Sequence, residues 1–174
     1  MKNYIVLIVL GTLTIVMLNQ NSAQGAEIIS SSALEEMLVS NGSEVKKRGF
    51  GQQSFNDPNA ASLGAIQFRY NSTVLTDDGR KQVEELAVAI KNISNIRFTI
   101  VGHTDATGGE EYNQVLSERR AMAVVKILAD EFGIASDRLA SKGEGESSLI
   151  DSDDPASGKN RRVEVINSGP ASIN

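Results

Sequence analysis

A strand, a polar loop and a helix follow one another between residues 96 and 131, and this stretch constrains the fold most. Residues 96–101 alternate apolar and polar side chains, which is typical of a half-buried strand. Residues 102–111 are polar and rich in glycine, and apolar side chains then recur at helical spacing over 113–131. This order predicts a strand and a helix packed on one core, joined by a loop that can present binding groups.

Similar patterns lie on both sides of this stretch. Alternation over 66–70 predicts a first strand, and apolar spacing over 77–90 predicts a helix capped by Thr76. Two further short strands are predicted at 138–141 and 162–166. The order predicts an α+β fold, a two-layer βαβαβ(β) sandwich with a mixed four-stranded sheet and its helices on one face. Right-handed crossovers would make the neighbouring strands of each strand-helix-strand unit parallel.

The chain divides into four parts by composition. Residues 1–26 combine one lysine with an uncharged apolar run over 5–18, as in a secretory signal peptide. That run is shorter than the roughly 20 apolar residues that a membrane-spanning helix needs. Residues 27–62 are predicted to form an N-terminal extension or tether with one short helix, either loosely ordered or folded against the main domain. The main domain is expected over 63–167, and 168–174 as a flexible tail.

Charge and composition exclude several classes of function. The chain has 17 Lys and Arg against 22 Asp and Glu, so nothing favours a nucleic-acid partner. It has no cysteine, which excludes disulfides, thiolate catalysis and a lipidated N-terminal cysteine. With one histidine, neither a metal site nor a cofactor is predicted. The acidic segment 151–154 lacks the glycine and glutamate that a calcium loop needs at its sixth and twelfth positions.

Two enzymatic interpretations of the polar loop can be considered. Ser117, His103 and Asp105 are the residue types of a catalytic triad, but Ser117 lies in no nucleophile elbow and no oxyanion loop is present. Asp105 with Glu110 or Glu111 could form a carboxylate pair, but both glutamates fit better as first-turn partners of a helix dipole. The chain is therefore not predicted to be an enzyme.

Asp105 and the arginine pair at 119 and 120 are the remaining candidates for a binding site. A guanidinium binds a carboxylate through two hydrogen bonds, and an aspartate binds an ammonium group. The set therefore predicts either a salt bridge that closes the loop onto the helix or a clamp for a zwitterionic ligand. Residue types alone do not choose between these alternatives, nor between Arg119 and Arg120.

An ordered set of motifs resembles the OmpA-like peptidoglycan-binding domain, the family of the outer membrane protein A C-terminal domain, the peptidoglycan-associated lipoprotein and MotB. The resemblance spans about residues 64–166. The residues that carry it are Gly102-His103-Thr104-Asp105-Ala106-Thr107-Gly108, Tyr112-Asn113, Leu116-Ser117-Glu118-Arg119-Arg120-Ala121, Gly143-Glu144-Gly145-Glu146 and Asn160-Arg161-Arg162-Val163-Glu164.

This resemblance implies both a function and a set of contacts. It implies non-catalytic binding of peptidoglycan through the meso-diaminopimelate of the stem peptide, which anchors or scaffolds the bacterial cell envelope. It also implies an exported protein of the periplasm or outer membrane. By position in the motif, Asp105 would bind the ammonium group of the diamino acid and Arg120 its carboxylate. The other ligand-binding residues that it implies are Thr107, Asn113, Leu116 and Arg161.

Some features leave alternatives open. Arg69 stands where members of the family often carry aspartate, so a pocket contact there is in question. His103 is expected to be structural. The N-terminal extension could associate with a membrane or an envelope protein. The alternative functions are a partner-binding envelope protein with a vestigial peptidoglycan site and a cell-wall hydrolase.

Overall fold

The computed structural model describes residues 27–39, 60–63, 66–69 and 71–171. The predicted signal peptide lies outside these residues. Within the described ranges, every helix is too short or too polar to cross a lipid bilayer. The elements are α1 (Ser31–Val39), β1 (Ala60–Leu63), α2 (Asp77–Asn92), β2 (Ile96–Gly102), α3 (Glu110–Asp130), the 3-10 turn η2 (Ser136–Arg138), β3 (Leu139–Gly143), the 3-10 turn η3 (Gly158–Asn160) and β4 (Val163–Pro170).

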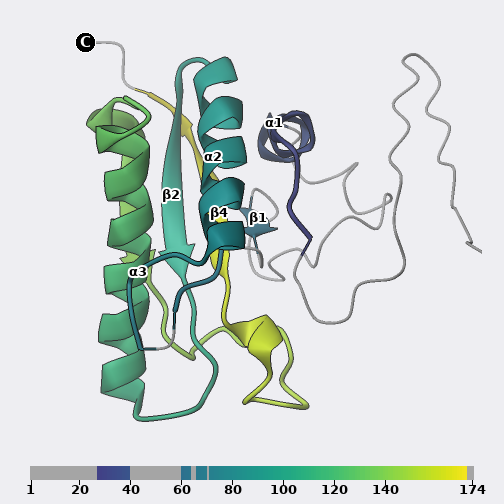
Figure 1. The fold of residues 1–174 in the computed structure, drawn as a ribbon, viewed down its shortest axis with the longest axis vertical. Helices are drawn as coiled ribbons and strands as arrows, with labels where there is room; N and C mark the ends of the chain where they lie inside the picture. Colours follow the sequence, from purple (N-terminus) through teal and green to yellow (C-terminus); the bar gives the residue numbers. More distant parts are fainter. Residues whose placement is uncertain (1–26, 40–59, 64–65, 70, 172–174) are drawn as a thin grey trace, which may run out of the picture.

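The last strand of the chain lies inside the sheet. The strand order is β1-β4-β2-β3, and β4 is antiparallel to both of its neighbours, whereas β2 and β3 are parallel. The prediction of parallel neighbours is therefore right for β2 and β3 and wrong for β1 and β2, which β4 separates. The helices α2 and α3 run along the sheet, and α1 lies beyond α2 (Figure 1).

The predicted first strand at 66–70 is wrong for residues 66–69, and residue 70 lies outside the described residues. The strand that joins the sheet, β1, comes earlier in the chain, and Phe68 forms only an isolated bridge with Leu75. The backbone N–H of Arg69 donates to the Val74 carbonyl at 2.8 Å, so this segment pairs with the residues just before α2. A local pairing of this kind gives the same apolar alternation as a strand in the main sheet.

The two long helices begin for different reasons. The Thr76 hydroxyl accepts a hydrogen bond from Gly79 N at 3.1 Å, which confirms the expected cap of α2. The helix α3 begins at Glu110, earlier than the expected start near residue 112, and its N-cap Gly109 makes no side-chain cap. Glu110 and Glu111 lie in its first turn, where the helix dipole favours negative charge.

One apolar core joins the helices to the sheet, and α3 approaches the sheet closely at two glycines. A Cβ atom on Gly102 would lie 2.3 Å from Ser117 O, and one on Gly143 would lie 2.5 Å from Glu118 N. These contacts fix the middle of α3 over the ends of β2 and β3. The largest fully buried apolar side chains of this core include Leu34, Leu38, Leu63, Ile66, Leu86, Ile90, Phe98, Ile100 and Leu128.

The helix α1 packs against the domain. Leu34 is fully buried and Leu38 is 2% exposed in the common core. The side-chain amide of Gln82 on α2 accepts from Ile29 N at 2.6 Å and donates to Ile29 O at 2.9 Å. Residues 31–39 of the N-terminal extension are therefore folded against the main domain rather than loosely ordered. The boundary at residue 62 stays a prediction.

We expect Leu34→Ala to lower the free energy of unfolding by about 2–5 kcal/mol, because it opens a cavity between α1 and α2. The control is Val39→Ala on the same helix, where the side chain is 54% exposed and a change within about 0.5 kcal/mol is expected. Urea unfolding measures both variants. Equal stabilities would mean that α1 does not dock in solution.

The strand β4 continues further than the sequence indicated. Its pairing with β2 reaches Pro170 opposite Ile96, with a register shift between Ile96 and Phe98. The predicted strand end at residue 166 and the flexible tail from residue 168 are therefore wrong for Ser168–Pro170. Ser168 and Gly169 fall at the register shift and Pro170 pairs with Ile96, and none of the three adds a buried apolar side chain, so the apolar pattern gives no sign of this end of the strand.

Candidate functional site

A pocket of about 740 Å³ lies where the loop after β2, the first half of α3 and the segment before β4 meet. The β2–α3 loop and the 150–160 segment reach the same end of the sheet (Figure 1). All six residues predicted as ligand-binding line this pocket: Asp105, Thr107, Asn113, Leu116, Arg120 and Arg161. The fold thus brings the whole predicted set together, and its role in binding stays a prediction.

Asp105 is held in place on both of its carboxylate oxygens. Its Oδ1 accepts from Thr107 N at 3.1 Å, which closes a tight turn in the loop. Its Oδ2 accepts from Arg161 Nη1 at 2.6 Å. The Asp105 side chain is 12% exposed and that of Arg161 is 54% exposed, so this ion pair lies at the mouth of the pocket. The partner of Asp105 is therefore Arg161 rather than an arginine of α3.

Arg120 is a largely buried cation that pairs with no carboxylate of the described residues. Its Nε donates to the Ser72 carbonyl at 3.2 Å, and its guanidinium lies 5.1 Å from the centre of the Phe68 ring. Burial lowers the pKa of Arg120, and the positive charge of Arg161 adds to this, while Tyr112 and Asp105 act in the opposite direction. Within the described residues no carboxylate forms an ion pair with Arg120. The guanidinium is thus held in position by Ser72 and Phe68, and Arg120 lines the pocket.

Asn113 braces the loop that carries Asp105. Its Nδ2 donates to the carbonyls of Asp105 at 3.3 Å and Thr107 at 3.2 Å, and to Glu146 Oε2 at 2.5 Å. Because the amide nitrogen is fully engaged by the protein, Asn113 acts mainly by holding the loop. Thr107 is exposed at the pocket, and the half-buried Leu116 supplies an apolar wall.

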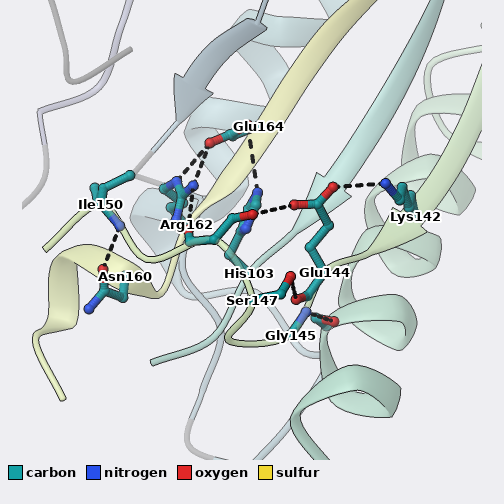
Figure 2. Close-up of polar contacts among 11 residues, drawn as sticks. His103, Lys142, Glu144, Gly145, Ser147, Ile150, Asn160, Arg162 and Glu164 are labelled. Atoms are coloured by element: carbon teal, nitrogen blue, oxygen red, sulfur yellow. Dashed lines mark hydrogen bonds and ion pairs between the residues drawn. The ribbon is translucent and has the colours of Figure 1, made fainter. Parts of the chain in front are cut away.

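Asn160 organises the segment that precedes Arg161. Its Oδ1 accepts from Ile150 N at 3.0 Å (Figure 2). The same oxygen accepts from Asp151 N at 2.9 Å. Its Nδ2 donates to three carbonyls, those of Asp151, Asp154 and Pro155, each at 3.2 Å. The acidic segment is therefore wrapped around a buried amide. Among the residues that the structure describes, no three acidic or histidine side chains are grouped to hold a metal ion.

A buried ion pair lies beneath the pocket, on the face of β4 opposite the apolar core. Arg162 Nη2 lies 2.6 Å from Glu164 Oε1 and also donates to the Ser148 carbonyl at 3.1 Å. His103 Nε2 lies 3.6 Å from Glu164 Oε2, and the three charged or titratable side chains are each about 3% exposed (Figure 2). Arg162 and His103 also line the pocket. His103 is thus enclosed as part of the pocket floor.

This polar cluster continues outward to Glu144. The Ser148 hydroxyl donates to Glu144 Oε2 at 2.8 Å, and Lys142 Nζ lies 2.8 Å from Glu144 Oε1 (Figure 2). The hydrogen bond from Lys142 is the main reason that the pKa of Glu144 is lowered. The Ser117 hydroxyl donates to Gln114 O at 2.8 Å and accepts from Gly145 N at 2.9 Å. Ser117 therefore joins α3 to the turn after β3 and is not hydrogen-bonded to His103.

Two residues that hold Arg120 are not indicated by the sequence pattern. Ser72 contributes only its backbone carbonyl, which no residue type can indicate. Phe68 belongs to the strand expected at 66–70, and that pattern does not indicate that its ring lies beside the Arg120 guanidinium. Arg69, the position that departs from the family pattern, is exposed and does not line the pocket. Its charge therefore lies outside the immediate surroundings of Asp105 and Arg120.

The sequence profile of the OmpA family matches residues 67–162, more than half of the chain. The chain belongs to the OmpA family. The matched region contains Asp105, Arg120 and every other predicted site residue.

Two relatives show how far this likeness extends. Outer membrane porin F of Pseudomonas aeruginosa is 36% identical over 102 residues, which cover 58% of this chain and 29% of that protein. Outer membrane protein A of Bordetella avium is 36% identical over 100 residues, which cover 56% of this chain and 51% of that protein. The chain thus spans about half or less of the length of these OmpA-family relatives.

Solved structures share the fold. The OmpA-like domain of FopA1 from Francisella tularensis has a TM-score of 0.53 and 28% identity, covering 66% of this chain and 75% of that one. The periplasmic domain of Helicobacter pylori MotB also has a TM-score of 0.53, at 21% identity, and the match covers 63% of this chain and 73% of that one. The expected OmpA-like α+β fold is confirmed.

Proposed function

We propose that this chain is a non-catalytic peptidoglycan-binding protein that anchors or scaffolds the bacterial cell envelope. Its ligand is the free amino-acid end of meso-diaminopimelate in the stem peptide. The observation that carries the proposal is Arg120, a largely buried guanidinium that lines the pocket with no carboxylate partner among the described residues.

The chemistry of the pocket fits a ligand with both charges on one carbon. The ligand carboxylate binds the outer nitrogens of Arg120, which Ser72 and Phe68 hold in a fixed orientation. The ligand ammonium binds Asp105 in place of, or beside, Arg161. Arg161 is exposed at the pocket mouth, so it can turn to the rest of the peptide.

The proposed location is the periplasm or outer membrane. It is supported by the apolar N-terminal run, which resembles an export signal, and by relatives that are named as outer membrane proteins. The association of the N-terminal extension with a membrane or a partner protein remains part of the proposal.

The test is co-sedimentation of the full chain with purified sacculi, followed by competition. We expect binding to sacculi that contain meso-diaminopimelate and little binding to sacculi that contain lysine at that position, because lysine lacks the second carboxylate. The free tripeptide L-alanyl-γ-D-glutamyl-meso-diaminopimelate should release the protein, and an equal concentration of the same tripeptide with L-lysine at the third position should not, because its side chain ends in an ammonium group without a carboxylate. Equal binding to both kinds of sacculi would overturn the diaminopimelate specificity, and binding to neither would overturn the function.

The same incubation examines catalysis. A binding protein leaves the sacculi intact, so no soluble peptidoglycan fragments are expected in the supernatant. Time-dependent release of fragments by the wild type would support the alternative of a cell-wall hydrolase.

A further inference from the structure

A second hollow lies beside the pocket, over the outer face of α3. It has a volume of about 850 Å³. The turn at 71–73 forms one side, and the first three turns of α3 form the other. Asn71, Tyr112 and Leu116 line both hollows, so the two are continuous. The Tyr112 hydroxyl also donates to Asn71 Oδ1, which joins the two sides where the hollows meet.

Arg119 lines only this second hollow. It is exposed, and in the described part of the chain its guanidinium has neither a hydrogen-bond acceptor nor an ion-pair partner. The other exposed basic residue of α3, Lys126, pairs with Asp130 one turn away. Consecutive residues of a helix point about 100° apart, so Arg120 and Arg119 serve two different surfaces.

The α3 side of the hollow has apolar surface between a glutamate and an arginine. Tyr112 is 51% exposed and Val115 is 41% exposed, on the same face as Arg119. Glu111 also lines the hollow, but it precedes Arg119 by eight residues, which is roughly 12 Å along a helix. A negative group beside Arg119 is therefore well separated from Glu111, with apolar surface between them.

We infer that this hollow is a second subsite, in which Arg119 binds another carboxylate of the peptide that carries the diamino acid. The inference rests on the proposed function, because the peptide enters through the neighbouring pocket. Tyr112 and Val115 cover the aliphatic part of the peptide, and Arg119 selects ligands whose adjoining residue is acidic.

The test pairs protein variants with peptide probes in titration calorimetry. The probes are L-alanyl-γ-D-glutamyl-meso-diaminopimelate and the same tripeptide with the glutamyl α-carboxylate converted to an amide. We expect Arg119→Ala to weaken binding of the acidic tripeptide about 3- to 10-fold and to leave the amide probe within about 2-fold. The loss should shrink as salt is raised, because the subsite is exposed. The wild type should prefer the acidic tripeptide by a similar factor.

Matched controls separate the possible causes. Lys126→Ala removes the same charge from the same helix outside both hollows and should change neither affinity. Both tripeptides also carry a chain-end carboxylate on the diamino acid, and adding a terminal D-alanine moves that carboxylate one residue further along the chain. If Arg119 binds it there in place of the glutamyl one, Arg119→Ala also weakens the extended amide probe. An equal effect of Arg119→Ala on every probe would overturn the subsite, as would no effect on any. If no probe binds the wild type, the proposed function itself is contradicted. If the probes bind the wild type and Arg119→Ala equally well, only the second subsite is contradicted.

Discussion

Arg120→Ala is expected to reduce binding to diaminopimelate-containing sacculi by at least about 30-fold, a cost of roughly 2–5 kcal/mol. The reason is that Arg120 is fixed by the Ser72 carbonyl and the Phe68 ring, so its guanidinium is already oriented for a carboxylate. Removing it leaves the ligand carboxylate in a pocket without a partner. Co-sedimentation over a range of protein concentrations measures the loss.

Folding of this variant should be preserved. Because burial lowers the pKa of Arg120, the folded state carries this charge at a cost in free energy. Its removal should therefore leave thermal stability nearly unchanged, although one hydrogen bond is lost. A binding site that opposes stability in this way is a common sign of function.

Two further variants sharpen the result. Arg120→Lys keeps the charge but loses the planar two-point contact, so intermediate binding is expected. Arg97→Ala removes an exposed arginine of β2 and should bind as the wild type does. Full binding by Arg120→Ala would show that the carboxylate contact lies elsewhere.

The sequence indicated which residues lie around one pocket better than it indicated the order of the sheet. The motif around Asp105 and Arg120 joins a strand end to a helix, so local order in the chain was enough to bring the two together. The pairing of Asp105 with Arg161 depends on β4 entering the sheet between β1 and β2. No periodicity within a strand indicates where it will insert.

Other features were hidden for a related reason. The buried amide of Asn160 holds its segment entirely through backbone groups, which are the same for every residue type. The Ser72 carbonyl beneath Arg120 is likewise a backbone group. The sequence predicts the first strand too late in the chain because residues 66–69 alternate for a local pairing with the segment before α2.

Arg162→Met is expected to give the largest loss of stability, about 3–5 kcal/mol of unfolding free energy. Glu164 would lose its hydrogen bonds from Arg162 Nε and Nη2 while staying 3% exposed, and the Ser148 carbonyl would lose its donor. A buried carboxylate that loses its guanidinium retains the cost of desolvation without the compensating attraction. Urea unfolding with an unchanged m-value is the measurement.

The double variant Arg162→Met/Glu164→Leu tests the cause. If the loss comes from the carboxylate left behind, removing that carboxylate should restore part of the stability, because apolar pairs often replace buried ion pairs at little cost. No recovery would mean that Arg162 acts mainly through Ser148 and through packing. Arg162 and His103 form the floor of the pocket beside Asp105. The double variant should therefore recover part of the unfolding free energy but not the binding to sacculi. The double variant would then be stable but would bind sacculi poorly. That result would mean that the fold does not need the buried Arg162–Glu164 pair, whereas ligand binding needs these polar groups in the pocket floor.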